Sequence, residues 1–206
     1  MNVNQSSPDQ IASTAATAGA AIVHAGETVL LRDGTHVLVR PIHPDDIELE
    51  RRFIKGLSPS SRRFRFLETM RSPSDALLKQ MTVINLATDA AYVALVGEGD
   101  LQREIGVARF SARADGHDCE FAVTVSDEWQ NRGLGTLLMA RLIKVARARG
   151  IESMHSSDAA DNTRMRRFAE HLHFQHMRDP DDSTMVIYSV DLNGVDSLRA
   201  KGPIAK

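Results

Sequence analysis

The chain has 206 residues, a formal net charge of −2 at pH 7, and 42% apolar and 25% charged residues. This length suits one sizeable core, and the nearly neutral charge gives no reason to expect binding to nucleic acid or to an acidic membrane. A single cysteine excludes an intrachain disulfide framework, and no apolar run approaches the roughly 20 residues that cross a bilayer. Because no secretory signal pattern opens the chain, we expect a cytoplasmic protein.

The composition divides the chain into three parts. Residues 1–25 are rich in Ser, Ala, Thr, Asn and Gln and are expected to form a flexible leader. One folded domain is expected over residues 26–193, followed by a tail at residues 194–206.

The first third of the domain predicts a hairpin followed by helices. Asp33-Gly34 separates the apolar runs Glu27–Leu31 and His36–Ile42, and Asp-Gly between such runs is a strong hairpin signal. Caps, prolines and apolar spacing then predict three helices: Asp45–Lys55, Ser58–Glu68 and Pro73–Val83.

The rest of the domain predicts strands around one long helix. Alternating apolar residues predict an antiparallel meander of three strands: Ala90–Gly97, Glu104–Arg113 and Asp118–Ser126. A helix from Arg132 to Gly150 follows, because apolar residues recur there at spacings of three and four. The strand Ile151–Ser157 then completes a right-handed parallel unit. A last helix and two strands close the domain: Asp161–Leu172, Phe174–Arg178 and Thr184–Leu192.

Two groups of charged residues have both a functional and a plain interpretation. Arg62, Arg63 and Arg65 are interleaved with apolar residues in the second helix. Solvated arginines on an amphipathic helix are favoured there over a surface that contacts substrate or anions. Asp127 and Glu128 follow the last meander strand, and solvation of the turn is favoured over pairing with cations of a substrate.

The stretch Cys119–Thr136 joins a strand to the start of the long helix. Glu120 is the odd residue in this strand, which otherwise alternates apolar side chains toward the core. Gly133 and Gly135 keep side chains out of the first helical turn and leave its backbone N–H groups open to a phosphate. No Gly-Lys-[Ser/Thr] follows, so this is not a P-loop, and the antiparallel strands before it argue against a dinucleotide-binding fold.

The segment Gln130-Asn131-Arg132-Gly133-Leu134-Gly135 resembles the signature of GNAT-fold N-acetyltransferases. Other segments are similar to the bacterial protein-lysine acetyltransferase branch, sometimes called Pat-like: Arg40-Pro41-Ile42, Leu57-Ser58-Pro59, Arg65-Phe66, Gly106-Val107-Ala108-Arg109, Glu120-Phe121-Ala122-Val123 and Asn162 with Met165. The resemblance spans about Glu27 to Leu192. It implies an α/β (α+β) GNAT fold, in which helices flank a mixed, mostly antiparallel sheet of about seven strands and a splayed parallel strand pair holds the cofactor.

The resemblance also implies acetyl-CoA as the acyl donor, with no metal. The backbone of Val123 and Val125 would pair with the pantetheine arm like an added strand. The turn that would hold the pyrophosphate consists of Gln130, Asn131, Arg132, Gly133, Leu134, Gly135 and Thr136. The Arg132 side chain either contacts the phosphates or is a solvated turn residue. Asn162 would hydrogen-bond the cofactor, and it is also a competent helix cap.

Glu120 matches the position that resembles the general base of this branch. A base is needed because a lysine amine of pKa about 10.4 is neutral in only roughly one molecule in 10³ at pH 7. We expect burial on the apolar strand to raise the pKa of Glu120 and suit it to this task. The alternative is that Glu120 pairs with Arg109 on the neighbouring strand.

Two positions depart from the family pattern. Many members carry a tyrosine seven residues after the asparagine, as the acid that protonates the departing thiolate, and here that position is Ala169. Protonation by solvent or by the displaced amine proton is the alternative. His173 stands where the family usually has glycine, which suggests an altered local turn.

The remaining candidates for chemistry are weak. His171, His173 and His176 do not share one helix face, so no metal site is predicted. Cys119 alternates away from Glu120 and is expected to fill the core instead of acting as an acyl-cysteine nucleophile.

These expectations predict an acetyl-CoA-dependent N-acetyltransferase, in which a primary amine attacks the thioester directly with Glu120 as general base. A protein lysine is the first choice of acceptor, and a small amine is the alternative. A non-catalytic acyl-CoA-binding module is the alternative from another class. The helices between residues 45 and 83 are expected to line the acceptor site, and the oligomeric state, monomer or homodimer, stays open.

Overall fold

The structure is a computed structural model that describes residues 26–68 and 70–193. The predicted leader at residues 1–25 and the predicted tail at residues 194–206 lie outside the described residues. Within the described part, no helix is both long and apolar enough to cross a membrane.

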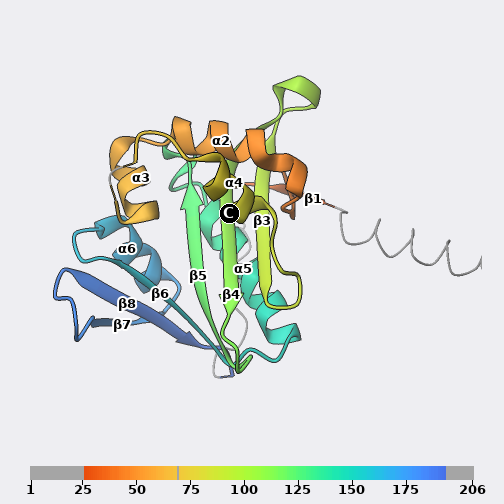
Figure 1. Cartoon of the computed structure of the whole chain (residues 1–206). Helices are drawn as coiled ribbons and strands as arrows, with labels where there is room; N and C mark the ends of the chain where they lie inside the picture. Colours follow the sequence, from red (N-terminus) through yellow and green to blue (C-terminus); the bar gives the residue numbers. More distant parts are fainter. Residues whose placement is uncertain (1–25, 69, 194–206) are drawn as a thin grey trace, which may run out of the picture.

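An eight-stranded sheet runs through the centre of the domain in the order β1-β2-β3-β4-β5-β6-β8-β7 (Figure 1). The strands are β1 Glu27–Leu30, β2 His36–Pro41, β3 Asp89–Val96, β4 Arg103–Ala112, β5 Asp118–Val125, β6 Ser153–Ala159, β7 Gln175–Arg178 and β8 Met185–Asp191. Only β5 and β6 are parallel, and each of the other neighbouring pairs is antiparallel. The predicted hairpin, meander and parallel unit are therefore confirmed, in a sheet of eight strands where about seven were expected.

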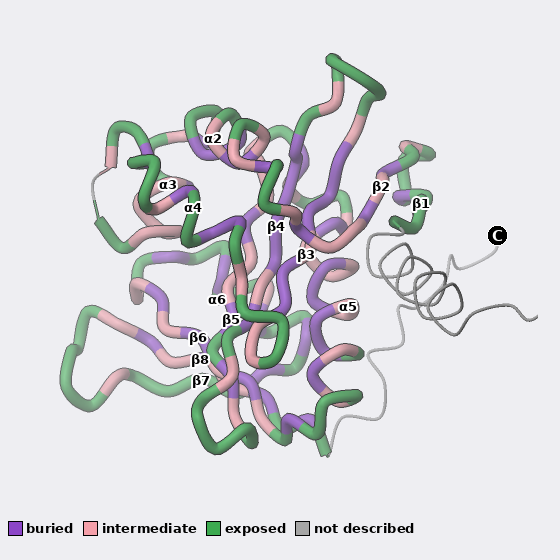
Figure 2. The backbone as a smooth tube through the Cα atoms, turned by 45° about the vertical axis from the view of Figure 1, so that its right-hand side comes forward, coloured by how far each residue is buried: buried purple, intermediate pink, exposed green. Residues whose placement is uncertain are grey.

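Helices cover both faces of the sheet and give the domain two cores. The helices are α2 Ile47–Gly56, α3 Pro59–Phe66, α4 Asp75–Thr82, α5 Leu134–Ala148 and α6 Thr163–His171, with short 3-10 turns η1 Pro44–Asp46, η2 Gly99–Leu101 and η3 Asp127–Trp129. Buried residues of α5 and α6 share one core, and those of α2 and α4 share the other. Figure 2 shows the buried residues concentrated along the central strands and the inner side of α5.

Side-chain caps begin α3, α4 and α6. The hydroxyl oxygen of Ser58 accepts a hydrogen bond from the Ser61 N–H at the start of α3. Ser74 caps α4 and Asn162 caps α6 in the same way. These side chains satisfy backbone N–H groups that the first helical turn leaves unpaired.

The end of α6 has the geometry of a glycine turn although its residue is histidine. His173 adopts a φ of 57°. The Phe174 N–H donates to the Ala169 carbonyl at 2.9 Å, and the His173 N–H donates to the Glu170 carbonyl at 3.1 Å. This is the Schellman pattern, in which the left-handed position favours glycine. The expectation of an altered turn is therefore wrong, because the backbone keeps the conformation typical of glycine. His173 adopts this conformation although a side chain makes it strained.

Strands β5 and β6 separate part-way along their length. Their pairing comprises Asp118 with Ser153, Cys119 with Met154, and Glu120 with His155. Beyond His155, β6 continues to pair with β8, while β5 continues to pair with β4. The two strands are thus splayed from Glu120 onward.

Candidate active site

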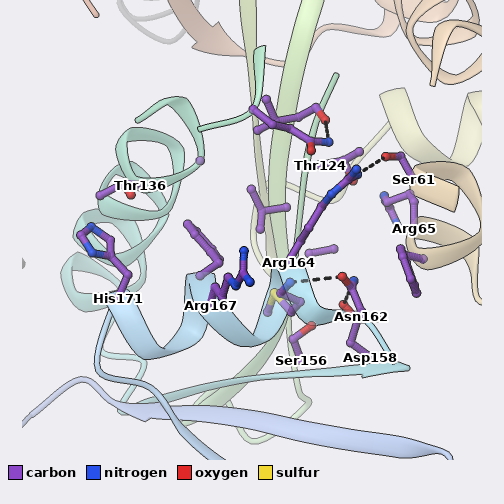
Figure 3. A pocket seen from close by; sticks show the side chains of 18 of the residues that line it. Ser61, Arg65, Thr124, Thr136, Ser156, Asp158, Asn162, Arg164, Arg167 and His171 are labelled. Carbon is purple, nitrogen blue, oxygen red and sulfur yellow. Dashed lines mark hydrogen bonds between the residues drawn. The ribbon is translucent and has the colours of Figure 1, made fainter. Parts of the chain in front are cut away.

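A cavity of about 650 Å³ lies where β5 and β6 separate. Its walls come from the outer half of β5, the turn before α5, β6, α6 and α3. Figure 3 shows Ser61 and Arg65 of α3 on one side of this cavity and Thr136 and His171 on the other. The cavity therefore extends between elements that cover opposite faces of the sheet.

Most of the predicted phosphate-binding turn lines the cavity. The lining residues of the turn are Gln130, Asn131, Gly133, Gly135 and Thr136. Gly133 has a φ of +88° and Asn131 has a φ of 60°, so the turn uses the left-handed region twice before α5 begins. This conformation directs the start of α5 at the cavity, where its dipole and N–H groups favour an anion.

Two residues of the predicted turn have side chains that point elsewhere. Leu134 is 1% exposed and packs in the core. The Arg132 guanidinium donates to Oδ2 of Asp33 at 3.0 Å and lies 4.8 Å from the ring centroid of Trp129. In this structure Arg132 joins the turn to the loop between β1 and β2, which neither interpretation of its side chain anticipated.

Gly135 allows α5 and α6 to approach each other closely. A Cβ atom at this position would lie 3.2 Å from Cε2 of Phe168. Such a contact is tighter than ordinary packing, so the glycine serves helix packing as well as access to the first turn of α5.

The strand residues expected at the pantetheine arm line the cavity at the splayed edge of β5. Val123 and Val125 both contribute to its wall. The Val125 carbonyl accepts a hydrogen bond from Nε2 of Gln130 at 3.0 Å. The side chain that opens the phosphate turn therefore also holds the end of β5.

Asn162 lines the cavity with its side-chain amide already engaged. Oδ1 of Asn162 accepts from the Met165 N–H at 3.2 Å, and Nδ2 donates to Oδ2 of Asp158 at 2.8 Å. Burial raises the pKa of Asp158 to about 6, although hydrogen bonds from the Ala159 N–H and Asn162 act to lower it. The capping role of Asn162 is confirmed, and contact with a cofactor remains a prediction.

Glu120 lines the cavity and is exposed. It is the last residue of β5 that pairs with β6. Glu120 was expected to be buried, and that part of the expectation is wrong. The alternative pairing with Arg109 is also absent. Burial lowers the pKa of Arg109, and the carboxylates that oppose this effect are Glu50, Glu104 and Asp89.

Arg65 lies in the same cavity as Glu120 and is half-buried. Burial lowers the pKa of Arg65 to about 10; the charge of Arg109 acts in the same direction, and Glu50 and Glu120 oppose it. Arg65 is therefore still charged at neutral pH. The expectation that the α3 arginines are simply solvated is wrong for this residue.

Two buried carboxyl groups lie behind this part of the cavity and were missed by sequence reasoning. Glu50 on α2 is 0% exposed and Glu104 on β4 is 6% exposed. Burial raises the pKa of both, and none of their carboxylate oxygens has a hydrogen-bond partner among the described residues. The spacing of Glu50 before Phe53 and Ile54, which places all three on one face of α2, was the available signal.

Asp127 holds α3 against the loop that follows β5. Its carboxylate accepts from the Ser58 N–H and Oγ, both at 2.8 Å, and from Oγ of Ser61 at 2.7 Å. Nη1 of Arg164 reaches across from α6 to Oγ of Ser61 at 3.2 Å (Figure 3). It also lies 3.4 Å from Oδ1 of Asp127. The interpretation of Asp127 as a solvated turn residue is wrong, because it orders the helix that lines one end of the cavity. Glu128 instead pairs with Arg103 at 2.7 Å.

Comparison with known proteins matches residues 61–174 to the model of the Acetyltransferase (GNAT) family. This chain belongs to the GNAT acetyltransferase family. It is 46% identical over 162 residues to Acetyltransferase PA5475 of Pseudomonas aeruginosa, covering 79% of this chain and 87% of the relative. It is 31% identical over 175 residues to Acetyltransferase Pat of Mycolicibacterium smegmatis, covering 82% of this chain and half (50%) of that protein. Among solved structures, the GNAT domain of S. lividans PAT is similar with a TM-score of 0.74 and 25% identity, covering 81% of this chain and 96% of that one.

Membership of the family establishes the class of enzyme. The chain is a GNAT acetyltransferase with Pat-like relatives, and the family uses acetyl-CoA as cosubstrate. The glycine turn, the splayed strand edge and the cavity between them fit such a thioester cosubstrate, which supplies the activated acetyl group. A nucleotide-binding α/β protein and a non-catalytic module are therefore not supported.

In this acetyltransferase, the residue at the position of the family's tyrosine acid is Ala169, which packs in the core. Ala169 is 1% exposed and does not line the cavity. The chain has two tyrosines, Tyr92 and Tyr188, both within the described residues, and neither lines the cavity. No phenol is thus available to a departing thiolate from this part of the chain.

The remaining candidates for chemistry were Cys119 and a metal site. Cys119 is buried on the α5 side of β5, and burial raises the pKa of its thiol to about 12. This agrees with a core role. Over residues 26–68 and 70–193, no group of three or more His, Cys, Asp or Glu side chains is arranged to hold a metal ion.

Proposed function

We propose that this acetyltransferase transfers the acetyl group to a primary amine of a protein lysine, with Glu120 as the general base. The amine nitrogen forms a bond to the thioester carbonyl carbon, the C–S bond breaks, and sulfur leaves with the electron pair. Glu120 takes the proton that the amine loses, directly or through water. In the absence of a cavity tyrosine, the thiolate takes its proton from solvent.

The role of Glu120 is supported by a comparison of the carboxylates that line the cavity. Glu120 and Asp158 are the acidic residues that line it. Asp158 is buried and accepts hydrogen bonds from Asn162 and the Ala159 N–H. Glu120 is exposed at the point where the strands separate, so it can exchange its proton with water after each turnover.

Support for a lysine acceptor comes from the relatives. The segments that resemble the protein-lysine acetyltransferase branch include Glu120-Phe121-Ala122-Val123, of which Glu120, Ala122 and Val123 line the cavity. The relatives named Pat and PAT cover most of this chain.

The test compares Glu120→Gln with the control Glu128→Gln, an exposed residue paired with Arg103 outside the cavity wall. Glu120→Gln should lower kcat for acetylation of lysine peptides by about 10²- to 10⁴-fold. Acetyl-CoA should still raise its Tm, since the phosphate turn is unchanged. The control should keep both properties. Unchanged turnover in Glu120→Gln would remove Glu120 from the base role, and a Tm unmoved by acetyl-CoA in the unmodified protein would contradict the cofactor assignment.

A further inference from the structure

We propose that Arg65 is a specificity-determining residue that binds a carboxylate of the acceptor, so that the preferred acceptor carries a carboxylate next to its primary amine. This inference rests on the proposed function, because it names the class of amine that the same site takes. The carboxylate can belong to an acidic residue beside a lysine or to a free amino acid. In both sources, the chemistry that Arg65 recognises is the same.

Arg65 shares the cavity with Glu120. Arg65 comes from α3 and Glu120 from β5, and both line the cavity. Figure 3 shows Arg65 beside Ser61, at the end of the cavity away from the phosphate turn. A group bound at Glu120 therefore has Arg65 as its charged neighbour on α3.

The Arg65 guanidinium has no hydrogen-bonded acceptor. Across the described residues, Arg65 makes no hydrogen bond and no ion pair within 4.0 Å, and its guanidinium carbon lies 5.1 Å from the centroid of the Phe66 ring. Arg164, which lines the same cavity, is engaged with Ser61 and Asp127. Arg65 therefore offers a planar set of donors that suits a carboxylate.

A second arginine, Arg109, lies near Arg65. Arg109 faces the same side of the sheet as Glu120, because Arg109 is paired with Ala122 and Ala122 lies two residues from Glu120. The charge of Arg109 acts to lower the pKa of Arg65, so the two guanidinium groups are close enough to repel each other.

This pair of guanidinium groups favours an acceptor that brings both charges. A simple ammonium adds a further positive charge beside Arg65 and Arg109, which is unfavourable in a partly dry site. An ammonium with a neighbouring carboxylate adds no net charge, and its carboxylate supplies the acceptor that the Arg65 guanidinium lacks. The structure thus disfavours amines surrounded by further cations, such as lysines in basic segments.

The experiment measures kcat/KM for two matched acceptor pairs. One pair is a lysine peptide with Asp or Asn directly before the lysine, and the other is β-alanine and its amide. The unmodified protein should prefer the carboxylate member of at least one pair by about 10- to 100-fold. Which pair shows the preference distinguishes a protein acceptor from a free amino acid. Arg65→Gln should abolish the preference, and Arg65→Lys should retain part of it.

The matched control is Arg63→Gln. Arg63 is on the same helix, pairs with Asp161 at 2.7 Å and lies outside the cavity wall, so the preference should persist. Because the readout is a ratio measured on one protein, a change in overall stability does not affect it. The inference is overturned if the unmodified protein shows no preference in either pair, or if Arg65→Gln keeps it.

A binding measurement separates this inference from the proposed function. Calorimetry with free CoA present reports acceptor binding without any transfer. If no acceptor is acetylated but the carboxylate acceptors bind the unmodified protein about 10-fold tighter than Arg65→Gln, the proposed function fails and the inference stands. Equal binding to both proteins overturns the inference whatever the rate of transfer.

Discussion

The Oγ atom of Ser61 lies 2.7 Å from Oδ1 of Asp127, and this hydrogen bond fixes the first turn of α3 to η3. Ser61 lines the cavity, and η3 lies between β5 and the phosphate turn. One carboxylate thereby connects α3, which lines one end of the cavity, to the segment that leads to the glycine turn before α5.

Removing this carboxylate should loosen α3. Asp127→Ala leaves the Ser58 N–H and two hydroxyl groups without their acceptor, so we expect the free energy of unfolding to fall by about 1–3 kcal/mol. Burial acts to raise the pKa of Asp127, but hydrogen bonds from Ser58 and Ser61 and the charge of Arg164 outweigh it and lower the pKa. The stabilisation is therefore present above the unfolded pKa and is lost as pH falls through the folded pKa.

The check is thermal unfolding together with KM for the acceptor, which should rise in Asp127→Ala. Asp182→Asn, in the loop between β7 and β8, is the control and should leave that KM unchanged. An Asp127→Ala variant with normal stability and normal KM would show that the contacts at Ser58 and Ser61 are incidental.

Asp158 should make stability depend on pH in an acidic window. Its folded pKa is about 6, raised chiefly by burial, and a free aspartate titrates near pH 3.9. The folded state therefore binds the proton more tightly, so the free energy of unfolding falls as pH rises from about 4 to about 6 and then levels off. Asp158→Asn removes this dependence and should be more stable relative to the parent by up to about 3 kcal/mol above pH 6.

The measurement is denaturant unfolding of the parent protein and of Asp158→Asn between pH 4 and pH 8. The difference between their free energies of unfolding is followed as a function of pH. Asp100→Asn, in the exposed turn η2, serves as the control and should give a flat difference. A difference for Asp158→Asn that is also flat would mean that the folded pKa of Asp158 is ordinary.

Replacing His173 by glycine should stabilise the protein. The φ of 57° at this position is one that a side chain disfavours. His173→Gly relieves the strain at the end of α6, and we expect a gain of about 1 kcal/mol, or roughly 2–4 °C in Tm. His176→Gly on β7 is the matched control and should lower Tm, because glycine weakens a strand. A lower Tm for His173→Gly would indicate that the imidazole makes compensating contacts.

Cys119 should be inert in the folded protein. Its side chain is 0% exposed, and burial raises the pKa of the thiol to about 12. We expect no alkylation by iodoacetamide under native conditions and rapid alkylation in denaturant, because the thiolate is the reactive form. Since the chain has a single cysteine, mass spectrometry reads this site without ambiguity. Rapid native labelling, or an acetyl group retained on Cys119 after mixing with acetyl-CoA, would contradict the core assignment.

The elements and the glycine turn before α5 follow from local patterns, which is why the sequence predicts them well. The alternation in Asp118–Ser126 and the spacing of three and four after Arg132 each depend on neighbours along the chain. The parallel unit that they form follows from chain handedness. Gly133 and Gly135 are where the phosphate turn was expected, because only glycine gives the backbone this freedom and this closeness.

The acceptor end was predicted poorly because its charges are set by tertiary packing. Arg65 looks like a solvated arginine on a short amphipathic helix, and its half-buried position depends on how α3 lies against β5. Glu120 was expected to be buried by its apolar neighbours, but β6 diverges at this residue and leaves it exposed. Strand divergence has no signal in the alternation of a single strand.

The contact between Gly135 and Phe168 limits how related sequences can diverge. A methyl group at position 135 would press on the Phe168 ring at 3.2 Å and push α6 away from the start of α5. Family members with alanine at this position should therefore carry a smaller residue at the position of Phe168. The two positions, one on each helix, should change together in evolution.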